Sequence, residues 1–135
     1  MRSGEVTMNP YLESLGYIET ELAKAQRECP AKDLPLGKKQ ERFSLMWIGL
    51  GLRIMADGNT MRHGETTNLQ GKGHTKNSTH YHKCGGDALL FIDGEYITDT
   101  PSYKKYGEWW EYYGGSWGGH FGDGNHFSIM HNGVK

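Results

Sequence analysis

Residues that commonly bind metal ions gather in two stretches of the second half of the chain. His80 and Asp87 stand seven positions apart within KNSTHYHKCGGDALLFIDG, and Asp123 and His126 stand three apart within FGDGNHF. The spacing alone is weak support for a site, because a chain with seven histidines often forms such pairs by chance. A polar loop that caps the entrance of a buried strand is therefore an alternative interpretation of His80 and Asp87.

The placement of these residues suits a catalytic zinc ion. Such an ion needs about three protein ligands with nitrogen or oxygen atoms and keeps a fourth position open for water. His80, Asp87 and His126 can supply the ligands, since we expect them at the ends of two neighbouring strands. Asp123 would act as a general base on the bound water. Arg62 would stabilise the oxyanion that forms when water attacks a carbonyl group.

The first part of the chain predicts two helices. The Asn9-Pro10 pair is typical of a helix cap followed by proline at the first helical position, and apolar residues recur at helical spacing over about 10–27. Two prolines and a glycine make 29–37 a connector. The sequence is then apolar almost all round over 43–55, which predicts a buried helix that ends at the Asp57-Gly58 turn.

The second part predicts a small sheet and one more helix. The polar stretch 59–80 has little periodicity, so we expect an irregular surface segment. The Asp93-Gly94 pair between two apolar runs predicts a hairpin, and aromatic residues at helical spacing predict an amphipathic helix from 103 to Gly114. A glycine-rich loop then leads into a short strand. We therefore predict an α+β fold in which helices cover one side of a small, mostly antiparallel sheet and a zinc cleft lies on the other.

Composition favours one globular domain over 1–135, with a helical part over 1–58 and the sheet and metal site over 59–135. The chain has 135 residues, of which 36% are apolar, enough for one core. The net charge of -1 argues against nucleic acid or an anionic membrane as a partner. Two cysteines form no disulfide framework, and no signal peptide or membrane span is recognisable. We expect a monomer that is made in a cytoplasm.

Two linked motifs carry a resemblance to a known family. The stretch NSTHYHKCGGDALLFIDGEYITDT, followed by GEWWEYYGGSWGGHFGDGNHF, resembles the zinc peptidases grouped with D-Ala-D-Ala carboxypeptidases and phage L-alanyl-D-glutamate endolysins, in the hedgehog/DD-peptidase superfamily. Their mark is S-x-H-x6-D, then a tryptophan and glycines, then D/E-x-x-H-F. Short phage-borne and prophage proteins of this kind share the blocks LF-x-DG-x-Y-x-TDT and FGDGNHF. The resemblance covers about 76–127 well.

Each matching position carries over a role from that family. The resemblance implies that His80, Asp87 and His126 bind one zinc ion and that Asp123 is the general base. Arg62 matches less closely as the cation that holds the substrate or the oxyanion. Arg53 is a second candidate for that cation, and Ser78 would support the loop that carries His80.

The resemblance implies a zinc metallopeptidase that hydrolyses the stem peptide of bacterial peptidoglycan. An L-Ala-D-Glu endopeptidase of a phage or prophage, an endolysin held in the host cytoplasm until it is released onto the cell wall, fits this implication best. A D-Ala-D-Ala carboxypeptidase is an alternative within the same family. A non-catalytic, zinc-stabilised wall-binding or virion structural module is an alternative of another class.

Other residues of similar chemistry have simpler interpretations. His82 would point away from His80 on an extended loop, so we expect no metal ligand there. His120 is expected to face solvent, Cys84 to be a small buried residue beside the strand, and Trp117 to support the final loop.

Overall fold

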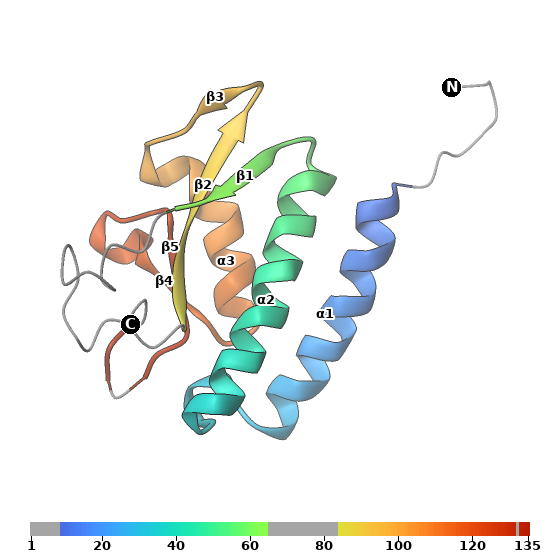
Figure 1. Cartoon of the computed structure of the whole chain (residues 1–135), viewed down its shortest axis with the longest axis vertical. Helices are drawn as coiled ribbons and strands as arrows, with labels where there is room; N and C mark the ends of the chain where they lie inside the picture. Colours follow the sequence, from blue (N-terminus) through green and yellow to red (C-terminus); the bar gives the residue numbers. More distant parts are fainter. Residues whose placement is uncertain (1–8, 65–83, 132) are drawn as a thin grey trace.

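The computed structural model describes residues 9–64, 84–131 and 133–135, which form helices on one side of a small sheet (Figure 1). The fold is α+β, as predicted. The helices are α1 (Pro10–Glu28), α2 (Leu36–Ala56) and α3 (Lys104–Tyr112). The short 3-10 helices are η1 (Ala31–Asp33), η3 (Thr100–Tyr103) and η4 (Gly118–Phe121). The strands are β1 (Thr60–His63), β2 (Gly85–Ile92), β3 (Glu95–Tyr96), β4 (Ser116–Trp117) and β5 (His126–Ser128).

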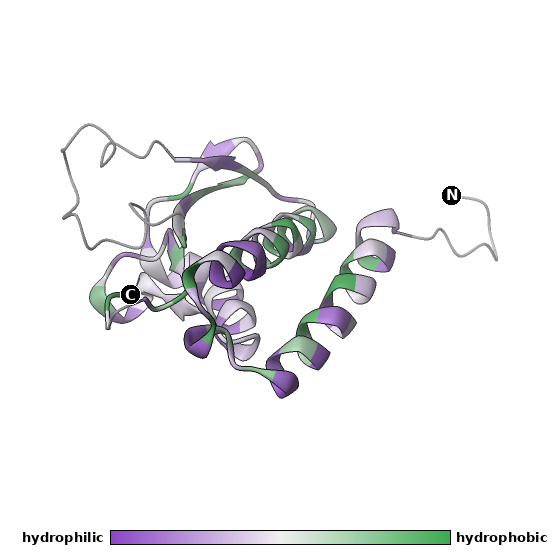
Figure 2. Ribbon diagram, turned by 60° about the horizontal axis from the view of Figure 1, so that its bottom comes forward, coloured by the Kyte–Doolittle hydropathy of each residue, from purple (hydrophilic) through white to green (hydrophobic). Residues whose placement is uncertain are grey.

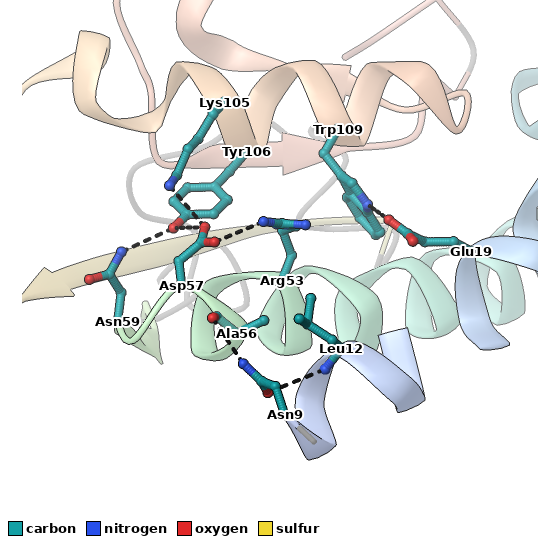
Figure 3. A network of polar contacts seen from close by, with 10 residues as sticks. All are labelled: Asn9, Leu12, Glu19, Arg53, Ala56, Asp57, Asn59, Lys105, Tyr106 and Trp109. Carbon is teal, nitrogen blue, oxygen red and sulfur yellow. Dashed lines mark hydrogen bonds and ion pairs between the residues drawn. The ribbon is translucent and has the colours of Figure 1, made fainter. Parts of the chain in front are cut away.

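The start of α1 confirms the predicted cap. The side-chain oxygen of Asn9 accepts hydrogen bonds from the backbone N–H groups of Tyr11 at 3.0 Å and Leu12 at 3.4 Å. Its amide nitrogen donates to the backbone oxygen of Ala56, at the last turn of α2, over 3.3 Å. One residue therefore satisfies the open end of α1 and joins it to the end of α2 (Figure 3).

The helix α2 packs between α1 and the sheet. Its buried apolar residues recur every three or four positions, at Phe43, Met46, Leu50 and Ile54, and so form one face. In Figure 2 the first turns of α2 are hydrophilic and its later turns are hydrophobic. The prediction of a helix buried all round is wrong for the opposite face, where Ile48 is 55% exposed, because α1, α3 and the sheet cover only part of the surface of α2. No described helix is long and apolar enough to cross a membrane.

The sheet is antiparallel, with the strand order β1-β2-β5-β4 and β3 paired to β2. The predicted hairpin is confirmed: Ile92 pairs with Glu95 around a turn in which Asp93 and Gly94 have φ of 52° and 80°. The prediction of an irregular segment over 59–80 is wrong for β1. That strand takes its hydrogen bonds from β2, a partner more than 20 residues away that no local pattern reveals. Residues 65–80 lie outside the described part.

The two faces of β2 have different neighbours. Ala88 and Leu90 are buried in the core beneath the helices, whereas Asp87 and Leu89, which alternate with them, are half-buried and face the other way. Side chains alternate along a strand, so this pattern follows from the backbone. The inner face of β2 thus contributes to the apolar core, while its outer face carries Asp87 together with the partly exposed Leu89 and Phe91.

The helix α3 also packs against the core. Tyr106 and Trp110 are buried, and the indole N–H of Trp110 donates to the backbone oxygen of Ser128 over 2.8 Å. The predicted end of this helix at Gly114 is confirmed by the left-handed φ of 98° at that residue.

A half-buried carboxylate, that of Asp57, joins the end of α2 to the start of α3 (Figure 3). Asp57 accepts hydrogen bonds from Arg53 at 2.8 Å, the Tyr106 hydroxyl at 2.8 Å and the Lys105 ammonium at 2.9 Å. Asn59 donates to the same tyrosine oxygen over 3.1 Å. Burial by itself disfavours the charged carboxylate, but the bonds from Lys105, Tyr106 and Arg53 outweigh it and lower the pKa of Asp57.

Asp57→Asn is expected to lower the free energy of unfolding at pH 7 by about 1–3 kcal/mol, the usual value of hydrogen bonds to a charged group. A carboxylate whose pKa is lowered by folding stabilises the protein above its unfolded pKa of about 3.9, and this contribution is lost as the pH falls through the folded value. The difference between parent and variant should therefore shrink below about pH 4. Urea denaturation at several pH values measures it.

Glu41→Gln is the matched control, because Glu41 pairs with Lys38 at 3.5 Å on the exposed surface of α2. This variant should differ little from the parent at any pH. An Asp57→Asn protein as stable as the parent at pH 7 would show that the network does not stabilise the fold.

Candidate functional site

Two of the candidate metal ligands face each other on the outer side of the sheet. Asp87 of β2 and His126 of β5 are direct Cα partners in an antiparallel pair, so their side chains emerge side by side on one face. The Nδ1 atom of His126 lies 3.6 Å from Oδ1 of Asp87. On the opposite face the next pair, Gly86 and Phe127, is buried in the core.

The ring of His126 is held in one orientation. Its side chain is 12% exposed, and Nε2 lies 3.1 Å from the main-chain oxygen of Lys135. A main-chain oxygen can only accept, so Nε2 carries the hydrogen and Nδ1 is the nitrogen turned toward Asp87. A histidine that binds a metal through one nitrogen usually donates from the other to an oxygen of this kind.

The distance between Asp87 and His126 is compatible with one shared ion. Nitrogen and oxygen ligands of tetrahedral zinc lie about 2.0–2.2 Å from the metal, which places them about 3.4 Å from one another. The observed 3.6 Å is close to that value and too long for a good hydrogen bond. Burial by itself lowers the pKa of His126, but Asp87, the Lys135 oxygen and the charge of Asp123 together raise it. The site therefore attracts positive charge.

Asp123 lies in the turn that leads into β5. Its backbone N–H donates to Gly118 over 2.9 Å, and its backbone oxygen accepts from the N–H of His126 over 3.1 Å. The side chain is exposed and lines a cavity of about 220 Å³. The other residues that line this cavity are Ser116, Trp117, Gly118, Phe121, His126 and Lys135. An acid–base group and a candidate metal ligand thus share one cavity.

Trp117 supports this loop, as predicted. Its indole is buried, and its N–H donates to the backbone oxygen of Gly124 over 2.7 Å. The ring lies so close to Gly107 of α3 and to Gly119 that a methyl group on either would overlap it. Trp117 therefore links α3 to the turn that carries Asp123.

The two candidate cations lie in different places. Arg62 is exposed on β1, opposite Leu89, and its guanidinium lies 5.9 Å from the ring centre of Phe91. Phe91 is four positions along β2 from Asp87, so the charge is directed toward the hairpin end of that strand. Arg53 binds Asp57 in the network between α2 and α3.

The remaining candidates are placed only in part. His80, Ser78 and His82 lie outside the described residues. The described ranges contain no group of three or more histidine, cysteine or acidic residues suited to a metal ion. His120 contacts Glu111 over 2.9 Å and is largely exposed, and Cys84 is fully buried, both as predicted.

Two residues of the cavity gave no signal in the sequence. Phe121 is 70% exposed and Lys135 lies after the last predicted strand, yet both line the cavity beside His126. Neither belongs to a motif or a periodic pattern. Lys135 reaches the cavity only because the final segment of the chain folds back toward β5.

No protein-family model matches the chain, and no curated protein matches it significantly.

Gly107→Ala is expected to destabilise the protein by about 1–3 kcal/mol, because the added methyl group overlaps the Trp117 ring. The matched control is Gly16→Ala in α1, where a methyl group would meet nothing within 4 Å. Alanine forms helices better than glycine, so the control should be more stable than the parent by about 0.5–1 kcal/mol. Thermal or chemical denaturation of the three proteins measures both effects. Equal stability of the two variants would contradict the proposed contact.

Proposed function

We propose that the chain is a zinc metallopeptidase that hydrolyses the stem peptide of bacterial peptidoglycan, as an L-Ala-D-Glu endopeptidase of the endolysin type. One observation carries the proposal: Asp87 and His126 lie 3.6 Å apart on the outer face of the sheet, next to a cavity lined by Asp123. Those three residues are also among the ones that the resemblance to zinc peptidases singles out.

The donor set suits zinc. Asp87 offers a carboxylate oxygen and His126 offers Nδ1, and both are ligand types that zinc prefers. His80 is the proposed third protein ligand. Zinc bound there would polarise the scissile carbonyl group and activate a water molecule.

The described residues have separate roles in this proposal. The main-chain oxygen of Lys135 holds the His126 ring, and Trp117 holds the turn that carries Asp123. The carboxylate of Asp123 accepts a proton from the attacking water and then passes it to the leaving amine. In this proposal the peptide binds at the cavity that Asp123 and His126 line.

The proposed activity predicts zinc-dependent release of free amino groups from purified peptidoglycan. The protein should release them when zinc is present, lose this activity on chelation and regain it when zinc is restored. Mass analysis of the fragments identifies the new ends. An endopeptidase creates an N-terminal D-glutamate, whereas a carboxypeptidase releases free D-alanine.

Binding to cell walls with one tightly held zinc ion per chain, but without release of amino groups, would contradict the peptidase. That result would favour a zinc-stabilised wall-binding module instead.

Asp123→Asn is expected to lower kcat/KM on peptidoglycan by about 10²–10⁴-fold while zinc affinity stays near that of the parent, because the change removes the base without removing a ligand. Asp33→Asn is the control, since Asp33 is an exposed aspartate in η1 that does not line the cavity. Competition with a zinc-binding dye measures affinity. An Asp123→Asn protein that clears cell walls as fast as the parent would refute the assignment of the base.

A further inference from the structure

A lysine that the proposed function does not yet use lies at the cavity beside His126. Of the residues described as lining this cavity, Lys135 is the one with an ammonium group, and Asp123 contributes a carboxylate. A cation beside a proposed peptide-cleaving site is a natural contact for an anionic part of the substrate. The question is whether the fold holds this side chain in place.

Contacts at both ends of Lys135 hold it at the cavity. Its main-chain oxygen lies 3.1 Å from Nε2 of His126. Its ammonium lies 5.8 Å from the ring centre of Phe121, within the range of a cation–π contact. The same residue is thus tied to the candidate metal ligand through its backbone and to the cavity wall through its side chain.

The segment that carries Lys135 is itself anchored to the helices. His131 and Val134 exchange two backbone hydrogen bonds of 2.9 Å, and Gly133 beside them has a left-handed φ of 77°. The ring of His131 accepts at Nδ1 from Lys39 over 3.3 Å, because an ammonium group can only donate. Lys39 is 5% exposed in the first turn of α2. A partly buried contact therefore connects α2 to the segment that carries Lys135.

Arg62 is less well placed for the same task. Its guanidinium lies by Phe91, toward the hairpin end of β2, whereas Asp87 and His126 lie at the other end of that strand. The cavity lining includes Lys135 and does not include Arg62.

We infer that Lys135 is a specificity-determining residue that binds a carboxylate of the peptide substrate adjoining the bond that is cut. The inference rests on the proposed function and extends it. It replaces Arg62 as the substrate-binding cation and names the substrate feature that is recognised, a free carboxylate on the D-glutamate residue. A peptide in which that carboxylate is an amide presents no charge to Lys135 and binds less tightly.

The test compares two uncleavable analogues of an L-Ala-D-Glu peptide, in which the scissile amide is replaced by a reduced CH2–NH bond. One carries the free carboxylate of D-glutamate, and the other carries the amide. Calorimetric titration of the zinc-loaded protein measures both affinities. The parent should prefer the carboxylate by about tenfold, and Lys135→Met should lose that preference while binding the amide as the parent does.

Three variants make the result specific. Lys38→Met removes an exposed ammonium on α2 away from the cavity and should keep the preference. Lys135→Arg keeps the charge and should also keep it. Arg62→Met should keep it as well, and loss of the preference there instead would overturn the inference.

Zinc affinity is the independent readout. Lys135→Met retains the main-chain oxygen that holds His126, so its zinc affinity should equal that of the parent. If the zinc affinity of Lys135→Met falls, this variant is compared with Lys135→Arg, which keeps the charge. Equal preferences of the two variants for the carboxylate analogue would then overturn the inference. A parent that prefers the carboxylate analogue but cleaves no peptide would contradict the peptidase and leave the carboxylate site standing.

Discussion

The antiparallel pairing of β2 with β5 is the constraint on which the candidate site depends. It places Gly86 opposite Phe127 on the inner face and Asp87 opposite His126 on the outer face. A shift of β5 by one residue against β2 would turn His126 toward the core, away from Asp87, and would expose Phe127. Burial of Phe127 in the core therefore stabilises the same register that brings the carboxylate and the imidazole together.

Trp110 and Trp117, which pack against glycines, connect α3 to the candidate site. Trp110 of α3 donates a hydrogen bond to Ser128 at the end of β5, and Trp117 fits against Gly107 of the same helix. These contacts fix the strand that carries His126 and the turn that carries Asp123 relative to one helix. Gly107 and Gly119 thus have a packing reason, since a larger side chain at either position would displace the Trp117 ring.

The Asp57 network and the Asp87–His126 pair lie on opposite sides of the sheet. On the helix side, Asp57 is saturated by three donors, and its lowered pKa reflects a role in joining α2 to α3. On the outer side, His126 and Asp87 meet beside an open cavity, and the pKa of His126 is raised. Each group contains one aspartate, but Asp57 accepts bonds from three protein donors, whereas His126 beside Asp87 lines a cavity. This is the difference expected between a structural network and a site that receives a ligand.

The sequence alone determined the local structure. The cap at Asn9, the hairpin turn at Asp93-Gly94 and the end of α3 near Gly114 depend on neighbouring residues, and each is found where the pattern predicts it. The motifs also singled out Asp87, Asp123 and His126, whose assignment to a zinc site stays a prediction together with that of His80.

Tertiary structure decided what lies far apart in the chain. The strand β1, the exposed face of α2 and the direction of Arg62 depend on partners that no local pattern contains. The same holds for the return of Lys135 to His126, which rests on a contact between α2 and His131 across more than 90 residues. Hydrogen bonds and packing between distant segments form only once the layers assemble, so the sequence specifies these contacts without displaying them in any local pattern.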